Sequence, residues 1–129
     1  MQKTQINPWT WQDAFGFSQG WRIDGCQSIV FVSGQGSISA DHGLMHEGNF
    51  AAQARVAFEN LRTVLEQAGA SLGDVVKLGV FLVGMEHLPE YGKVLSEFFE
   101  GQPPASTLVG VSALAQPGMM LEVEAYAVL

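Results

Sequence analysis

An alternation of apolar and polar residues at the end of the chain, in residues 119–129, constrains the fold more than any other feature. Its apolar positions are Leu121, Val123, Ala125 and Ala127, and the positions between them are Glu122, Glu124 and Tyr126. A period of two residues predicts a β-strand with one set of side chains on each face of a sheet. The two carboxylates then lie on one face, about 7 Å apart. They are either a candidate for acid–base chemistry or a pair of solvated residues on an outer face.

Five further strands are predicted from β-branched or alternating runs bounded by turn residues. They are residues 2–6 (an edge strand), 21–24, 28–33, 75–83 and 106–111. The Asp24–Gly25 pair predicts that the second and third of these strands form a hairpin. After the third strand, Gly34 and Gly36 indicate a bulge, or a backbone that another group approaches closely.

Two amphipathic helices are predicted between the strands. The first begins after Asn49, a good N-cap residue, and ends at Gly69. Its apolar stripe consists of Phe50, Ala54, Ala57, Phe58, Leu61, Val64, Leu65 and Ala68, and Gln53 falls among the outward polar positions. The second helix has Pro89 in its first turn. Its buried face consists of Leu88, Tyr91, Val94, Leu95, Phe98 and Phe99.

This order of elements predicts a single α+β domain over residues 1–129, a mixed β-sheet with two helices on one face. Hydrophobic residues make up 47% of the chain and charged residues only 15%, which favours a folded core over disorder. So little charge also favours an oligomer that hides part of the apolar surface. A well-filled core explains the same composition.

The charge of the chain excludes several classes of partner. Its net charge is −7, and the six Lys and Arg residues are scattered, so we expect no binding to nucleic acid or to anionic membranes. No stretch approaches the roughly 20 apolar residues of a membrane span, and we see no signal peptide. We therefore expect a cytoplasmic protein. The one cysteine, Cys26, leaves no internal disulfide and no zinc site of several cysteines.

Two loops attract attention for their side chains. His42 and His46 have the spacing of a helical metal site, but Gly43 and Gly48 indicate a loop, and we expect no metal there. Residues 9–17 crowd four aromatic rings, Trp9, Trp11, Phe15 and Phe17, into an irregular segment. Such rings either close one end of a hydrophobic core or line a pocket. We expect them to close one end of the core.

Five short motifs occur in order along nearly the whole chain. They are Ser33-Gly34-Gln35, Ala51-Ala52-Gln53-Ala54-Arg55, Gly73-Asp74-Val75-Val76-Lys77, Pro104-Ala105 and Leu121-Glu122-Val123-Glu124-Ala125. On these motifs the chain resembles the YjgF/RidA family of small trimeric proteins. The resemblance implies a chorismate-mutase-like α+β fold. It also implies a homotrimer whose sheets form an inner barrel, with three clefts between neighbouring subunits.

The resemblance further implies a chemistry. The best-known branch of the family hydrolyses reactive 2-enamine and 2-imine acids to 2-keto acids and ammonia. The carboxylate of this chain that matches the family is Glu122, which would orient or deprotonate the attacking water. Matching contacts around a small-molecule substrate would come from Phe17, Ser33, Gly34, Gly92, Ser106, Thr107 and Leu108. The resemblance implies neither a metal ion nor an organic cofactor.

The sequence departs from this branch at the position that would bind an anion. Where the family's deaminases carry an arginine that clamps the substrate carboxylate, this chain has Ser106. Phe17 stands where a tyrosine is usual, and Gly92 stands where a deaminase has an asparagine. The expected cleft is therefore less polar and lacks its anion clamp. Arg55 or Arg22 are the alternative sources of a positive charge.

Two functions remain open at this point. One is a hydrolase of an imine or enamine other than a standard 2-imino acid, with Glu122 as its catalytic residue. The other is a non-catalytic trimer that binds a small metabolite or regulates a partner, with Glu122 as a polar contact. An endoribonuclease is disfavoured by the acidic charge and by the lack of a catalytic histidine pair. Glu124 has no family match and is interpreted as structural.

Overall fold

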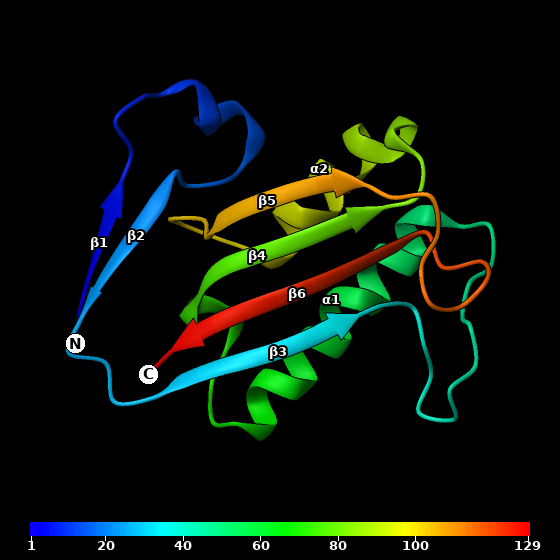
Figure 1. Ribbon diagram of the computed structural model, residues 1–129, viewed down its shortest axis with the longest axis horizontal. Coiled ribbons are helices and arrows are strands. Elements are labelled where there is room, and N and C mark those ends of the chain that lie inside the picture. Colours follow the sequence, from blue (N-terminus) through cyan, green and yellow to red (C-terminus); the bar gives the residue numbers. More distant parts are fainter.

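A four-stranded mixed sheet forms the centre of the protein, which we describe from a computed structural model of residues 1–129. Its strands are β3 (Ile29–Gln35), β4 (Val75–Leu82), β5 (Ala105–Gly110) and β6 (Leu121–Val128). Across the sheet they run in the order β3-β6-β4-β5, with β4 and β5 parallel and the other pairs antiparallel (Figure 1). The C-terminal strand β6 is therefore an inner strand of the sheet.

Two helices, α1 (Phe50–Gln67) and α2 (Leu88–Phe98), lie on the same face of this sheet (Figure 1). The Asn49 side chain caps α1 by accepting a hydrogen bond from the Ala52 amide at 3.1 Å. At the other end Gly69 has a φ of 79°, and the Ala70 amide bonds back to the Leu65 carbonyl at 2.8 Å. The predicted caps and the predicted α+β arrangement are thus confirmed.

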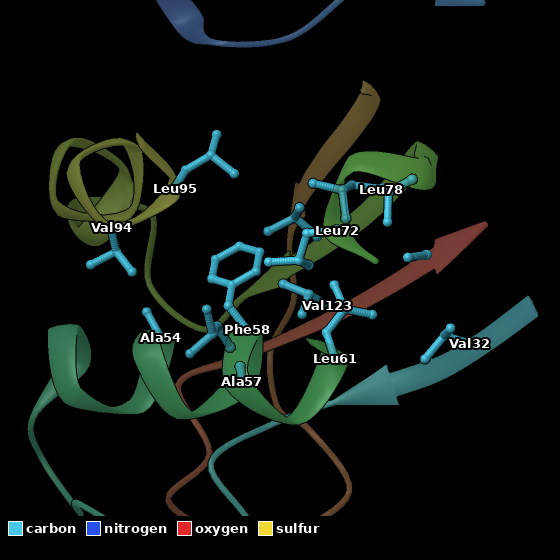
Figure 2. Close-up of a cluster of buried hydrophobic side chains, with 14 of the residues drawn as sticks. Val32, Ala54, Ala57, Phe58, Leu61, Leu72, Leu78, Val94, Leu95 and Val123 are labelled. Carbon is cyan, nitrogen blue, oxygen red and sulfur yellow. The ribbon is translucent and has the colours of Figure 1, made fainter. Parts of the chain in front are cut away.

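The core lies between the two helices and the covered face of the sheet (Figure 2). The alternation in β6 is confirmed, because its apolar side chains are buried on this face and its two glutamates point to the other. The core residues of α1 and α2 include Phe58, Leu61, Leu65, Tyr91 and Val94. Burying a large apolar side chain contributes about 1.5–3 kcal/mol, so this layer holds the helices on the sheet.

The structure corrects part of the predicted helix faces. Val64 and Leu88 are 38% and 42% exposed, and Ala68 is also exposed. The sheet covers a narrower strip of each helix than the apolar pattern suggested. Gln53, predicted to face outward, is fully buried. Its amide group donates to the carbonyls of two loop residues, His46 (3.2 Å) and Gly118 (3.0 Å), and its oxygen accepts the Met120 amide (2.9 Å).

The predicted hairpin at Asp24–Gly25 is wrong. Strand β2 (Gly20–Asp24) pairs with the predicted edge strand β1 (Gln2–Ile6) in a separate two-stranded sheet, and β3 pairs with β6. The cause lies just beyond the turn. The Ser28 amide donates to the Leu129 carbonyl at 3.0 Å, and the Leu129 amide donates back to Ser28 at 2.9 Å. These two bonds hold Ser28 beside Leu129, so the segment after the turn continues as β3 along β6 and does not return along β2.

The two-stranded sheet is attached to the start of β5. Ser18 forms an isolated parallel bridge with Ala105, and its amide donates to the Pro104 carbonyl at 3.0 Å. The Trp21 indole donates to the Pro103 carbonyl at 3.0 Å. Three short 3₁₀ helices complete the fold: η1 (Trp11–Phe15), η2 (Leu72–Asp74) and η3 (Met85–His87). None of the helices is both long and apolar enough to span a bilayer.

Candidate functional site

Glu122 lies against the backbone of Gly34 on the open face of the sheet. The register between β3 and β6 shifts between Val32 and Gln35, which places a bulge at this point. A Cβ atom on Gly34 would stand 2.0 Å from the Glu122 Oε1 atom, so only glycine leaves room for the carboxylate as it lies here. The prediction that a group approaches this glycine closely is confirmed, and the group is Glu122.

Glu124, the next residue of β6 on the same face, also lies against a glycine. It pairs in register with Gly79 of β4, and a Cβ there would stand 2.6 Å from the Glu124 Oε1 atom. Beside it the Lys77 ammonium donates to the Thr107 hydroxyl at 2.8 Å. These residues line a hollow of about 180 Å³. Neither Glu122 nor Glu124 forms an ion pair within the chain. The sequence did not indicate this environment for Glu124.

A larger groove of about 600 Å³ has Glu122 among its lining residues. It is walled by α1, by the loop after β3 and by the loop before β6. Its lining residues include Gly34, Ser39, His42, Asn60, Val64 and Gln116. His42 and His46 sit in a loop with positive φ angles of 68° and 57°, so the helical spacing does not arise. No three metal-binding side chains of the chain cluster together.

Ser106 and Glu122 lie on opposite faces of the sheet. Leu78 of β4 pairs in register with Ser106 on one side and with the buried Ala125 on the other. Ser106 therefore belongs to the face that the helices cover, as does Leu108, which pairs with Val80. Thr107 pairs with Gly79 and points to the open face with the two glutamates. One chain alone does not bring Ser106 and Glu122 together.

The remaining predicted residues are spread over the surface. Ser33 is exposed in the bulge next to Gly34. Gly92 lies on the exposed side of α2, where a Cβ would meet no atom within 4 Å. Phe17 is half-buried beside Ser18, whose bridge to Ala105 brings it to the start of β5. In one chain Glu122 thus lies with Gly34, Phe17 lies with the start of β5, and Gly92 lies apart on α2.

The aromatic loop does not plug the core, contrary to our expectation. Trp9, Trp11 and Phe15 are 58%, 56% and 64% exposed. The two-stranded sheet carries this loop out beyond the β5 edge of the main sheet (Figure 1). Residues of the open sheet face are also exposed: Ile29, Phe31, Val109 and Tyr126. The rings of Phe31 and Tyr126 pack against each other with centroids 5.2 Å apart.

The two arginines named as alternative sources of a positive charge are both paired within the chain. Arg55 binds Glu97 through two hydrogen bonds of 2.9 and 3.0 Å, and Arg22 binds Asp24 through two of 2.9 and 3.2 Å. The guanidinium of Arg55 lowers the pKa of Glu97 through its hydrogen bonds and its charge. Within this chain, neither arginine is free to bind a substrate carboxylate.

Comparisons with known proteins agree with this architecture. The family model described as Endoribonuclease L-PSP matches residues 12–129. A protein of the conserved Rid family from Yersinia pestis, described as of unknown function, superposes with a TM-score of 0.90 at 33% identity, covering 100% of both chains. A RutC family protein of Pyrococcus abyssi is 37% identical over 78% of each chain. The 2-iminobutanoate/2-iminopropanoate deaminase of Dermatophagoides farinae is 33% identical over 79% of each.

The fold is a small α+β fold that superposes over its whole length on a Rid-family protein. The match over most of the chain makes the assignment specific: this chain belongs to the YjgF/RidA family. The resemblance inferred from the five motifs is thereby confirmed.

Proposed function

We propose that this protein is a homotrimeric hydrolase that cleaves the C=N bond of a small imine or enamine in clefts between neighbouring chains. The separation of Ser106 and Glu122 on opposite faces of the sheet carries the proposal. A cleft that uses both must take one from each of two chains. The exposed apolar side chains of the open face, among them Phe31 at 71% exposure, also favour contact with another chain.

In the proposed reaction, Glu122 holds the attacking water. Its carboxylate accepts a proton as the water oxygen bonds to the C=N carbon and returns that proton to the nitrogen. The new hydroxyl then gives up its remaining proton to the nitrogen as the C–N bond breaks, and the nitrogen leaves as ammonia with the electron pair of that bond. The Gly34 backbone supports this carboxylate from one side. The related deaminase from Dermatophagoides farinae, named for its 2-imino acid substrates, makes this reaction class the first to test.

The substrate of this chain differs from a standard 2-imino acid. Ser106 stands at the anion-binding position of the deaminases, and a hydroxyl does not neutralise a carboxylate. Arg55 and Arg22, the alternative clamps, are each held by an acidic neighbour. We therefore propose an imine or enamine whose reacting part carries no carboxylate. A cytoplasmic location fits a chain with one cysteine, Cys26.

The second candidate is a trimer that binds a small metabolite without turnover. It is favoured by the loss of polar groups at Phe17 and Gly92, where deaminases carry a hydroxyl and an amide. In this case Glu122 is a hydrogen-bonding contact and no catalytic base. An endoribonuclease, the activity named in the description of the family model, remains disfavoured by the net charge of −7.

An imine-hydrolysis assay separates these candidates. Imines are generated by oxidases and trapped with semicarbazide, and a hydrolase suppresses the trapping. A hydrolase predicts suppression by the natural chain that disappears in Glu122→Ala. Activity on 2-imino acids gained only in Ser106→Arg would mean that the scaffold is competent but its natural ligand is another compound. If no variant hydrolyses any of the imines, the binding function is favoured. If light scattering shows a monomer, the cleft shared between chains is refuted.

A further inference from the structure

The exposed aromatic rings next to the start of β5 form a cluster. The Trp11 ring meets Phe17 edge to face at a centroid distance of 5.7 Å, and it meets Phe15 at 6.4 Å. Trp11 and Phe15 nevertheless leave more than half of their surface in solvent, at 56% and 64%. Large rings held together and left open offer their faces to something outside the chain. We call Trp11, Phe15 and Phe17 the aromatic cluster.

The aromatic cluster belongs to the same part of the molecule as Ser106. Phe17 directly precedes Ser18, which bridges Ala105, the residue before Ser106. A second anchor, the Trp21 indole bonded to the Pro103 carbonyl at 3.0 Å, fixes the two-stranded sheet there. The position at which the deaminases bind an anion is therefore flanked in this chain by aromatic rings, and Ser106 itself supplies no positive charge.

All three arginines of the chain are neutralised, whereas Glu122 is not. Arg22, Arg55 and Arg62 each pair with a carboxylate of their own chain. The Lys77 ammonium, which pairs with no carboxylate, donates to the Thr107 hydroxyl beside Glu124. Glu122, in contrast, has no cationic partner. A ligand that complements an unpaired carboxylate is positively charged, and aromatic faces attract such a charge through their quadrupoles.

We propose that the ligand of the cleft is an organic cation, with the aromatic cluster against its positively charged end and Glu122 as its counter-charge. This proposal rests on the proposed function for the shared cleft, and it names the substrate class as an iminium ion without a carboxylate. The protonated form is the better electrophile. R₂C=NH₂⁺ and H₂O give R₂C=O and NH₄⁺: the water oxygen bonds to carbon, the C–N bond breaks toward nitrogen, and the charge leaves with the ammonium.

Binding of a matched pair of probes tests the cation site without turnover. Choline and its neutral carbon analogue, 3,3-dimethylbutan-1-ol, have nearly the same shape, and calorimetry measures both. We expect choline to bind the natural protein about tenfold more tightly than the alcohol. Trp11→Leu and Glu122→Gln should each remove most of this preference. Trp9→Leu is the control, because Trp9 is exposed on the same loop but lies outside the cluster. Equal binding of both probes by the natural protein overturns the proposal.

Turnover of two imine classes separates this proposal from the proposed function. An amine oxidase acting on benzylamine supplies an imine without a carboxylate, and an L-amino-acid oxidase acting on leucine supplies a 2-imino acid. We expect the natural protein to hydrolyse the first about tenfold faster or more. Faster hydrolysis of the 2-imino acid would overturn the cation proposal and leave the hydrolase standing. A preference for choline with neither imine hydrolysed would support the cation site and refute the hydrolase.

Discussion

Replacing Gly34 by alanine tests directly whether the position of the Glu122 carboxylate matters. The new Cβ would stand 2.0 Å from the Glu122 Oε1 atom, whereas ordinary contact begins at 3.4 Å. The carboxylate must therefore move by at least roughly 1.4 Å, the difference between these distances. A misplacement of about 1 Å in a catalytic group can lower the rate about 100-fold. We expect hydrolysis by Gly34→Ala to fall by about that factor.

The same substitution should leave the fold almost unchanged. Gly34 has no positive φ, so alanine is not strained there, and the atoms in its way all belong to the flexible side chain of Glu122, from Cγ to Oε1. Fewer unfolded conformations for alanine contribute about 0.4–1 kcal/mol, which offsets part of the cost of moving the carboxylate. We expect the free energy of unfolding to change by less than about 1 kcal/mol.

Gly79→Ala is the matched control for this experiment. Its Cβ would stand 2.6 Å from the Glu124 Oε1 atom and would displace Glu124 instead of Glu122. Imine hydrolysis and thermal melting of the two variants are measured side by side. If Gly34→Ala and Gly79→Ala are equally active while both remain folded, the Glu122 carboxylate in its position against Gly34 is not the catalytic group. That result would refute the proposed role of Glu122.

Three further substitutions test the description of the fold. Gln53→Leu leaves two carbonyls and an amide of the loops without their partner, and we expect urea unfolding to show a loss of about 2–4 kcal/mol. Tyr91→Phe removes a buried hydroxyl that has no hydrogen-bond partner and whose pKa is raised by burial. We expect unchanged or higher stability, within about 1 kcal/mol, in the same measurement. Arg55→Gln breaks an exposed pair in which the arginine lowers the pKa of Glu97, so its stabilisation exists at neutral pH and is lost as the pH falls below the usual carboxyl value of 4.5. Melting curves of Arg55→Gln and the natural chain should therefore differ slightly at pH 7 and converge at acid pH.

The local patterns of the sequence predicted the elements and their faces well. The period of two in residues 119–129 identified which side chains of β6 face the core, since burial on one face of a strand leaves that pattern. Asn49 and Gly69 marked the ends of α1 because each satisfies backbone groups within a few residues. The close approach at Gly34 was also foreseen, although its partner Glu122 was not.

The errors come from partners that are distant along the chain. The Asp24–Gly25 pair is a local hairpin signal, but Leu129 captures the segment that follows it, and no local pattern reports that contact. Gln53 was assigned to the outside because its side chain is polar. It is buried because it bonds to backbone atoms of two loops, and the helix pattern gives no sign of those partners. The opposite faces of Ser106 and Glu122 follow only from the register of β4 between their strands.

The inner position of β6 determines when the protein can fold. This strand follows β3, β4 and β5 in the sequence, yet both β3 and β4 need it as a neighbour, and it separates them across the sheet. During translation the earlier strands therefore remain with their pairing edges exposed until β6 has left the ribosome. Deleting residues 121–128 would remove an inner strand and leave β3 without its neighbour in the sheet. For a chain built in this way, synthesis of β6 is the step that permits the sheet to close.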